Sequence, residues 1–222
     1  MTASNLTSAE TPVEMSAREL FRAAYENRYT WDSRFPGYTA DVVSTIGENT
    51  YSGTVRVNPD LKAEVAGIED EQTHQMLAGQ LFEIAIHRVR RAFEDTHGKN
   101  TFSYGDKDES GAQEILVGGK GEGDRYKLAN NEVTMVHRHI HGIVVTIYTA
   151  SSHDTGEGYL SHRYDSVYHD PNSGEQKGGK SLFTDEYEKV GDYVILNRRR
   201  IETVGEPDQE YVFSNIQLLP AQ

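Results

Sequence analysis

From about residue 101 to residue 218, the chain alternates hydrophobic and polar positions in short runs. Such period-two alternation is typical of strands that bury one face. Turn signals such as GGKGEGD, HDTGEG and DPNSGE, rich in Gly, Asn, Asp and Pro, separate the runs. Three further strands are expected between residues 37 and 68. The positions of the first of these that share a face are Tyr38, Ala40, Val42 and Ile46. The pattern predicts a large antiparallel sheet in meander order.

Two helices are predicted in the first hundred residues. Ser16 followed by Glu19 is a capping box, in which each side chain binds a free backbone amide at a helix start. The acidic residues 69–71 begin a second helix, because negative charge stabilises the positive end of the helix dipole. This helix is expected to end at about Asp95, and two apolar stripes predict its burial over a wide arc. The stripes are Leu77, Leu81 and Ile84, and Phe82, Ile86, Val89 and Phe93.

The order of these elements predicts an α+β fold. We expect a strongly curved antiparallel sheet, or open β-barrel, of about 9–12 strands. The long helix would lie in its concave side, with the short N-terminal helix beside it. No linker rich in Pro, Ser or Gly divides the chain. We therefore expect a single α+β open-barrel domain over residues 16–222, after a disordered N-terminal tail over residues 1–15.

Composition narrows the possible partners. The 222 residues include 35 acidic and 22 basic side chains, for a formal net charge of −13. This charge repels phosphate backbones, so we expect no nucleic-acid binding. The chain has no cysteine, which excludes disulfides and thiolate metal sites. Its N-terminal residues resemble no secretory signal, and no run approaches the length of a membrane span, so a cytoplasmic protein is expected.

Four segments carry a family resemblance. ARELFRAAYENRYTWDSRFPGY lies near the N-terminus, and YDSVYHDPNSGE, FTDEYEKVGDYVILNRRRIET and EYVFSNIQLL follow in the C-terminal half. The chain resembles an uncharacterised cyanobacterial family that shares a domain of unknown function. Its order of elements is also similar to the lipoprotein carriers of the LolA/LolB type. The resemblance implies an incomplete barrel around a helix, whose concavity holds acyl chains, and a place beside photosynthetic (thylakoid) membranes.

One group of side chains indicates metal chemistry. His137, His139 and His141 alternate along one predicted strand, which places three imidazoles on the same face. Imidazole is a good ligand for zinc and similar metals. However, three such positions lie in a line, whereas a tetrahedral site draws ligands from more than one strand. An exposed polar strand face explains the pattern as well, and we expect no bound metal.

Two other motifs have simpler explanations. The run from Gly174 to Ser181 matches the phosphate-binding pattern GxxxxGK(S/T), but a hairpin turn precedes it and a strand is expected after it. A parallel strand and a helix would be needed for nucleotide binding. Arg198 and Arg200 share a strand face and could bind an acidic partner. Pairing with acidic residues on neighbouring strands is the more common arrangement.

These observations favour a non-enzymatic binding protein without a cofactor. A concave sheet around an apolar helix can hold a small lipid- or pigment-like ligand. The residues expected to line such a site are Phe82, Ile86, Tyr38 and Val42. The 13 tyrosines suit a pocket, but they equally suit a protein interface, so an assembly factor with a protein partner is the competing interpretation. The alternative function, from a different class of protein, is a metal-dependent enzyme that uses His137, His139 and His141.

Overall fold

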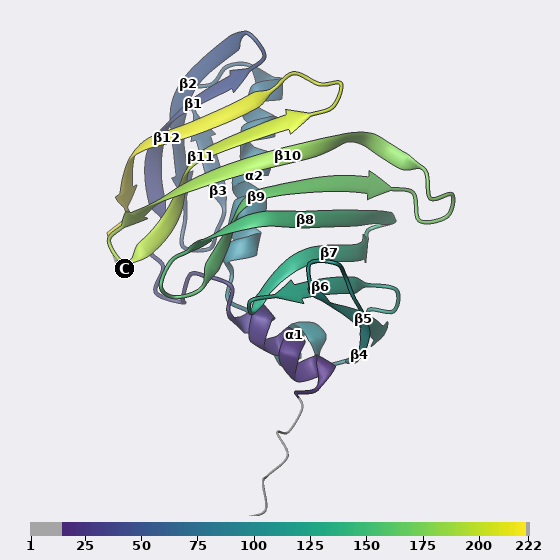
Figure 1. Ribbon diagram of the computed structural model, residues 1–222. Helices are drawn as coiled ribbons and strands as arrows, with labels where there is room; N and C mark the ends of the chain where they lie inside the picture. The colour runs from purple at the N-terminus through teal and green to yellow at the C-terminus, as the bar shows by residue number, and fades with distance from the viewer. Residues whose placement is uncertain (1–14, 221–222) are drawn as a thin grey trace, which may run out of the picture.

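The computed structural model describes residues 15–220, so most of the predicted tail over residues 1–15 lies outside the described residues. Twelve strands form one antiparallel sheet in the order β3-β2-β1-β12-β11-β10-β9-β8-β7-β6-β5-β4 (Figure 1). The strands are β1 (Tyr38–Ile46), β2 (Asn49–Val57), β3 (Ala63–Ala66), β4 (Asn100–Lys107), β5 (Gln113–Gly119), β6 (Arg125–Ala129), β7 (Glu132–Ile140), β8 (Ile143–Asp154), β9 (Tyr159–His169), β10 (Gln176–Val190), β11 (Tyr193–Thr203) and β12 (Gln209–Leu218).

The sheet confirms the predicted antiparallel meander. Consecutive strands pair from β4 to β12 and again from β1 to β3, because short turns join them. One pairing joins distant parts of the chain: β1 lies beside β12, with Val42 opposite Phe213. The sheet ends at β3 on one side and at β4 on the other, so it is open and not a closed barrel.

Three helices complete the described part of the chain: α1 (Ala17–Glu26), α2 (Glu71–Arg88) and α3 (Phe93–His97). Both features of the capping box at the start of α1 are present, with Ser16 and Glu19 each binding the other's backbone amide. At the start of α2, the side chain of Asp70 accepts a hydrogen bond from the amide of Thr73. Each helix therefore begins where local side-chain chemistry places it.

The predicted end of the second helix at Asp95 is wrong. Val89 leaves the helix with an extended backbone (φ −65°, ψ 125°) and forms a parallel bridge with Trp31. The backbone amide of Trp31 donates to the carbonyl oxygen of Arg88 at 2.8 Å. A partner from a distant segment thus satisfies a carbonyl that the helix leaves free at its C-terminus. The chain then restarts as the separate helix α3.

Two hydrophobic clusters fill one side of the sheet, which we call the inner face. In the first, the large core, Leu77, Leu81 and Ile84 of α2 pack against β1, β2 and β9–β12. Figure 1 shows α2 crossing behind β11, β10 and β9 in this view. The second, the aromatic core, joins α1 and α3 to β5 and β6, with Phe21 lying 4.4 Å from Tyr126 between ring centroids. The opposite side of the sheet is the outer face.

Candidate functional site on the inner face

A strip of the inner face lies between the two cores. Val145 of β8 pairs with Tyr168 of β9, and Ile147 pairs with Ser166, so the four side chains share one face of the sheet. We call these four residues the middle strip. Neither hydrophobic cluster of the described residues includes any of them. Tyr168 is 38% exposed, whereas Val145 is buried. The middle strip therefore lies outside both cores, and Tyr168 is its exposed member, whereas Ser166 is buried like Val145.

The solvent-facing side of α2 is unexpectedly apolar. Phe82 and Ile86 are four residues apart and so lie on one helix face, away from the stripe that enters the large core. Phe82 is 62% exposed and Ile86 is half-buried, so the expectation that this stripe is buried is wrong for Phe82. Phe93, the last member of that stripe, is buried, but it belongs to α3 and to the aromatic core. The sheet covers only one side of α2.

One flank of α2 faces the middle strip. Burial raises the pKa of Tyr168, and the negative charge of Glu83 adds to the increase. Glu83 directly follows Phe82 in α2. Successive residues of a helix are about 100° apart, so Glu83 lies on the flank next to the side that carries Phe82.

The structure separates the four residues that were expected to line a ligand site. Tyr38 and Val42 on β1 are 2% and 1% exposed and lie inside the large core. Phe82 and Ile86 lie on the other side of α2, which faces solvent. The role of these residues as ligand contacts stays a prediction, and the geometry favours the pair on α2.

A buried polar network attaches α2 to the sheet. Arg199 of β11 donates to both carboxylate oxygens of Asp185 on β10, at 2.8 and 2.6 Å. The same guanidinium donates to the hydroxyl of Tyr164 at 2.8 Å and to the side-chain oxygen of Gln80 on α2 at 2.9 Å. Asp185 and Arg199 are almost fully buried. A buried ion pair is tolerated when hydrogen bonds satisfy its remaining groups, and this one also joins helix to sheet.

Sequence reasoning missed this network. The sequence analysis assigns a role to Arg198 and Arg200 of this strand but none to Arg199 or Asp185. A usable signal was present, because each charged residue stands at a position where strand alternation predicts an inward side chain. Phe183 and Asp185 share a face of β10, and Arg199 and Ile201 share a face of β11.

His87, near the end of α2, lies in a positively charged environment. Burial lowers its pKa to about 4, and the charges of Arg88, Arg28, Arg199 and Arg91 lower it further. Its surface is nevertheless exposed to water. The ring is therefore neutral at pH 7.

The three histidines proposed as metal ligands do not converge. His137 and His139 lie on the outer face of β7, with ring centroids 5.8 Å apart, and His141 lies in the following turn with φ at +48°. His137 is hydrogen-bonded to Thr146 at 2.8 Å, and burial lowers its pKa. Among residues 15–220, no three His, Cys, Asp or Glu side chains are grouped closely enough to hold a metal ion. Metal binding by these residues stays an untested hypothesis.

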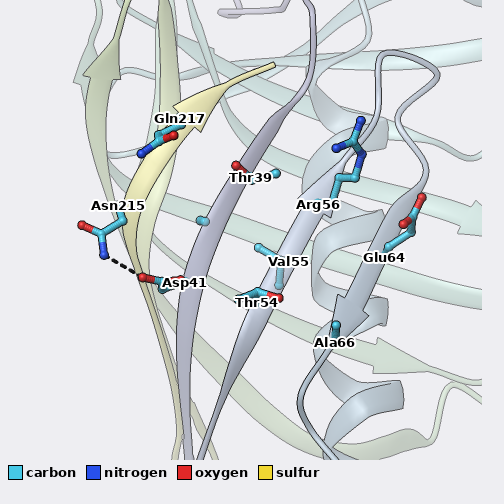
Figure 2. A pocket seen from close by; sticks show the side chains of 10 residues that line it. Thr39, Asp41, Thr54, Val55, Arg56, Glu64, Ala66, Asn215 and Gln217 are labelled. Atoms are coloured by element: carbon cyan, nitrogen blue, oxygen red, sulfur yellow. Dashed lines mark hydrogen bonds between the residues drawn. The ribbon is translucent and has the colours of Figure 1, made fainter. Parts of the chain in front are cut away.

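A polar hollow lies on the outer face of β1, β2, β3 and β12. It has a volume of about 610 Å³ and is bordered by charged and amide side chains. Figure 2 shows Asn215 reaching across to Asp41, to which it donates at 2.6 Å (Figure 2). Asn215 stands in a bulge of β12 with φ at +51°. The lining residues are Thr39, Ala40, Asp41, Thr54, Val55, Arg56, Glu64, Ala66, Asn215 and Gln217. This polar hollow does not suit an apolar ligand.

The other two motifs have structural roles. Arg198 forms an ion pair with Glu210 at 2.6 Å, and Arg200 pairs with Asp208 at 3.2 Å, so the pairing with neighbouring acidic residues is confirmed. Gly174 lies in the turn before β10, and the segment from Gly179 to Ser181 lies within that strand. No helix follows the motif, so it lacks the geometry of a phosphate-binding loop.

The chain belongs to a known family. A family model described as "Protein of unknown function (DUF3386)" matches residues 13–219, which confirms the resemblance to a domain of unknown function. The cyanobacterial origin that the resemblance implies stays a prediction. A comparison with curated proteins found no match. No helix in residues 15–220 is long and apolar enough to cross a membrane.

Two solved structures match most of the chain at low sequence identity. One is a domain from Vibrio parahaemolyticus described as an outer membrane lipoprotein-sorting protein, with 8% identity, a TM-score of 0.39, and 93% of each chain covered. The other is a LolA superfamily protein from Nitrosomonas europaea, with 8% identity, a TM-score of 0.37, and coverage of 94% of this chain and 96% of that one. The similarity to the LolA type that the sequence implies stays a prediction.

Proposed function

We propose that this protein binds a small apolar, lipid-like ligand without chemical turnover. The ligand lies along the solvent side of α2 and reaches toward the middle strip. The observation that carries the proposal is the exposure of Phe82, 62% of whose surface meets water although a core is available to the same helix. Contiguous exposed apolar surface marks interaction sites, and Phe82 with the half-buried Ile86 forms the apolar surface on this side of α2.

Several neighbours of Phe82 support the proposal. Ile86 extends the apolar surface of Phe82 by one helical turn. Gly79, three residues before Phe82, leaves open space on the helix, because a Cβ added at Gly79 would meet nothing within 4 Å. Tyr168 and Ile147 offer partly exposed surface on the strip across from this flank. Apolar walls with a few polar groups are typical of small-molecule sites. The tight packing of α2 through Leu77 and Leu81 gives this surface a rigid support.

The competing function is that of an assembly factor whose protein partner covers the same helix face. Native mass spectrometry, followed by solvent extraction of protein purified without a tag, distinguishes the two. We expect a co-purifying apolar molecule of low mass. A stoichiometric protein partner without such a molecule would favour the assembly factor, and the bare chain alone would count against both.

A direct test uses the uncharged dye Nile red. Phe82→Ser should weaken dye binding about ten-fold or more, because burial of an aromatic side chain contributes roughly 1.5–3 kcal/mol. Tyr148→Ser is the matched control, since Tyr148 is a large aromatic residue on the outer face that is 47% exposed. Equal effects of the two substitutions would contradict a site on α2.

The enzyme alternative has its own test. If His137 and His139 hold a catalytic metal, elemental analysis of gently purified protein should find zinc, iron or copper near one equivalent. We expect substoichiometric metal, unchanged in a His137→Gln variant, because the two rings point to Thr146 and Asp124 and not to a common centre. One equivalent of metal that is lost in the variant would support the enzyme.

A further inference from the structure

The polar hollow on the outer face contains charged side chains that the fold does not neutralise. Arg56 of β2 and Glu64 of β3 stand directly opposite each other in the register of the sheet. Opposite charges at such positions stabilise a sheet when they pair. Here, however, Arg56, Glu64 and the nearby Asp41 of β1 form no ion pair within residues 15–220. Three charges in one hollow are therefore available to a ligand.

Hydrogen bonds to two asparagine side chains hold these charged groups in place. Asn58 bridges Arg56 and Glu64, because it accepts from Nε of the arginine at 2.7 Å and donates to Oε1 of the glutamate at 2.7 Å. Asn215 donates to Oδ2 of Asp41 at 2.6 Å. The β-bulge in β12 gives Asn215 its left-handed backbone, and bulges redirect side chains at functional sites. The charged groups are thus oriented without being neutralised.

Each charged group keeps hydrogen-bonding capacity for a ligand. In the part of the chain that the structure describes, the terminal nitrogens of Arg56, Nη1 and Nη2, donate to no protein atom. Likewise, Oδ1 of Asp41 and Oε2 of Glu64 accept no hydrogen bond from that part of the chain. A guanidinium can bind a carboxylate through two parallel hydrogen bonds, and a carboxylate accepts hydrogen bonds from an ammonium group. The hollow can therefore bind both signs of charge at once.

The three charges alternate in sign across three adjacent strands. Asp41 lies on β1, Arg56 on β2 and Glu64 on β3, and neighbouring strands are about 4.8 Å apart. Figure 2 shows the short side chain of Thr39 between Asp41 and Arg56. Thr39 and Thr54 are shorter than the charged residues around them, which leaves the hollow of about 610 Å³ over them. A small molecule in this hollow can reach all three charged groups.

We infer that the polar hollow binds a small molecule with one carboxylate and two cationic groups, as in a basic α-amino acid. The ligand carboxylate pairs with Arg56, whose planar donors suit it, and the cationic groups pair with Asp41 and Glu64. The two negative charges and the one positive charge of the hollow are then all compensated. A metal ion fits less well, because the guanidinium of Arg56 lies between the two carboxylates and repels a cation.

This second site is separate from the proposed site on α2. The polar hollow lies on the outer face of the sheet, whereas α2 packs against the inner face. A basic α-amino acid and an apolar ligand can therefore bind at the same time. Each site can be tested without the other.

The test is a nuclear magnetic resonance titration of the full chain with L-lysine at pH 7 and constant ionic strength. The side-chain amide signals of Asn58, Asn215 and Gln217 report on the hollow. Three further probes each lack one charged group: norleucine lacks the side-chain ammonium, Nα-acetyl-L-lysine lacks the α-ammonium, and pentane-1,5-diamine lacks the carboxylate. We expect each of them to bind at least about ten-fold more weakly than L-lysine, which is ~1.4 kcal/mol.

Two variants remove single charges from the hollow. Arg56→Gln and Asp41→Asn should each weaken L-lysine binding about ten-fold, and both side chains are exposed, so the fold should be retained. Arg56→Gln should not weaken binding of the diamine, which has no carboxylate. Arg163→Gln is the matched control and should leave the affinity for L-lysine unchanged. Arg163 is also exposed on the outer face and has no ion pair within residues 15–220, but it lines a different hollow.

Several outcomes would overturn the site. Equal binding of L-lysine and the diamine would mean that the net charge of −13 merely attracts cations. An affinity for L-lysine that is unchanged in both Arg56→Gln and Asp41→Asn, or signal changes that avoid the three amides, would place the ligand elsewhere. Absence of L-lysine binding would overturn the inference directly. None of these outcomes affects the apolar site on α2, which is tested by Phe82→Ser and Nile red.

Discussion

The large core and the aromatic core stabilise the same sheet in different ways. The large core joins strands from both ends of the chain through the pairing of β1 with β12, and it surrounds the buried pair of Asp185 and Arg199. The aromatic core is built from neighbouring elements, where Phe21, Tyr25 and Phe93 pack edge to face around His97. The large core therefore depends on the pairing of distant segments of the chain, and the aromatic core depends on aromatic contacts between neighbouring elements.

This difference explains where the candidate site lies. The middle strip between the two cores belongs to neither of them, and its Tyr168 is exposed. Polar and charged side chains border the strip on both sides, with the Arg199 network toward the large core and Arg138 toward the aromatic core. The division into two cores leaves Tyr168 exposed between them, and the proposed ligand would contact this residue.

The largest effect is expected from a charge in the large core. Leu81→Asp should unfold the protein, because Leu81 is 1% exposed and a buried unpaired charge costs several kcal/mol. Thermal melting followed by circular dichroism measures the change. Phe82→Asp, one residue further along the same helix, is the control and should alter the melting temperature little. Similar losses in both variants would contradict the orientation of α2.

Removing one member of the buried ion pair should have the next largest effect. Asp185→Ala leaves the Arg199 guanidinium buried without its carboxylate, which costs roughly 3–5 kcal/mol in such pairs. Urea unfolding measures the free energy of unfolding of wild type and of each variant. The double variant Asp185→Leu with Arg199→Met should recover much of the loss, since it removes both charges. A double variant as unstable as the single one would indicate that the hydrogen bonds to Gln80 and Tyr164 matter more than the charge.

The aromatic core should respond to pH. Burial lowers the pKa of His97 to about 4, and Arg138 and Arg28 lower it further. The unfolded chain therefore binds this proton more readily between about pH 6.5 and pH 4. The stabilisation by neutral His97 is fully present above pH 6.5 and is lost as the pH falls toward 4. From pH 7 to pH 5, wild type should lose about 2 kcal/mol more than His97→Phe, in which His87 still titrates. Parallel curves of unfolding free energy against pH for wild type and His97→Phe would contradict this assignment.

The smallest effect is expected at the start of α1. Ser16→Ala removes the side chain that accepts from the Glu19 amide, and loss of such a cap costs about 1 kcal/mol. Hydrogen exchange of the Ser16→Ala variant, compared with wild type, should be accelerated more in α1 and the aromatic core than in the large core. Equal acceleration in both cores would show that they unfold as one unit.

Much of the fold could be predicted from the sequence. The strand meander, the capping box at Ser16 and the helix start at Glu71 appear where the pattern places them. Period-two alternation, turn residues and caps act over a few neighbouring positions, so the local chain is sufficient to encode them. Strand alternation also predicts that Asp185 and Arg199 point inward. It does not predict that the two charges pair, because the partner of a buried charge lies on another strand.

The tertiary structure decided the features that matter most for function. Trp31 ends α2 at Arg88, β12 pairs with β1, and Arg199 reaches Gln80 across 119 positions of the sequence. The exposure of Phe82 follows because the sheet covers one side of α2 and no other element within residues 15–220 covers the opposite side. These features depend on which distant segments meet, since burial and charge compensation are properties of the assembled chain, whereas helix and strand periodicity are properties of neighbouring residues.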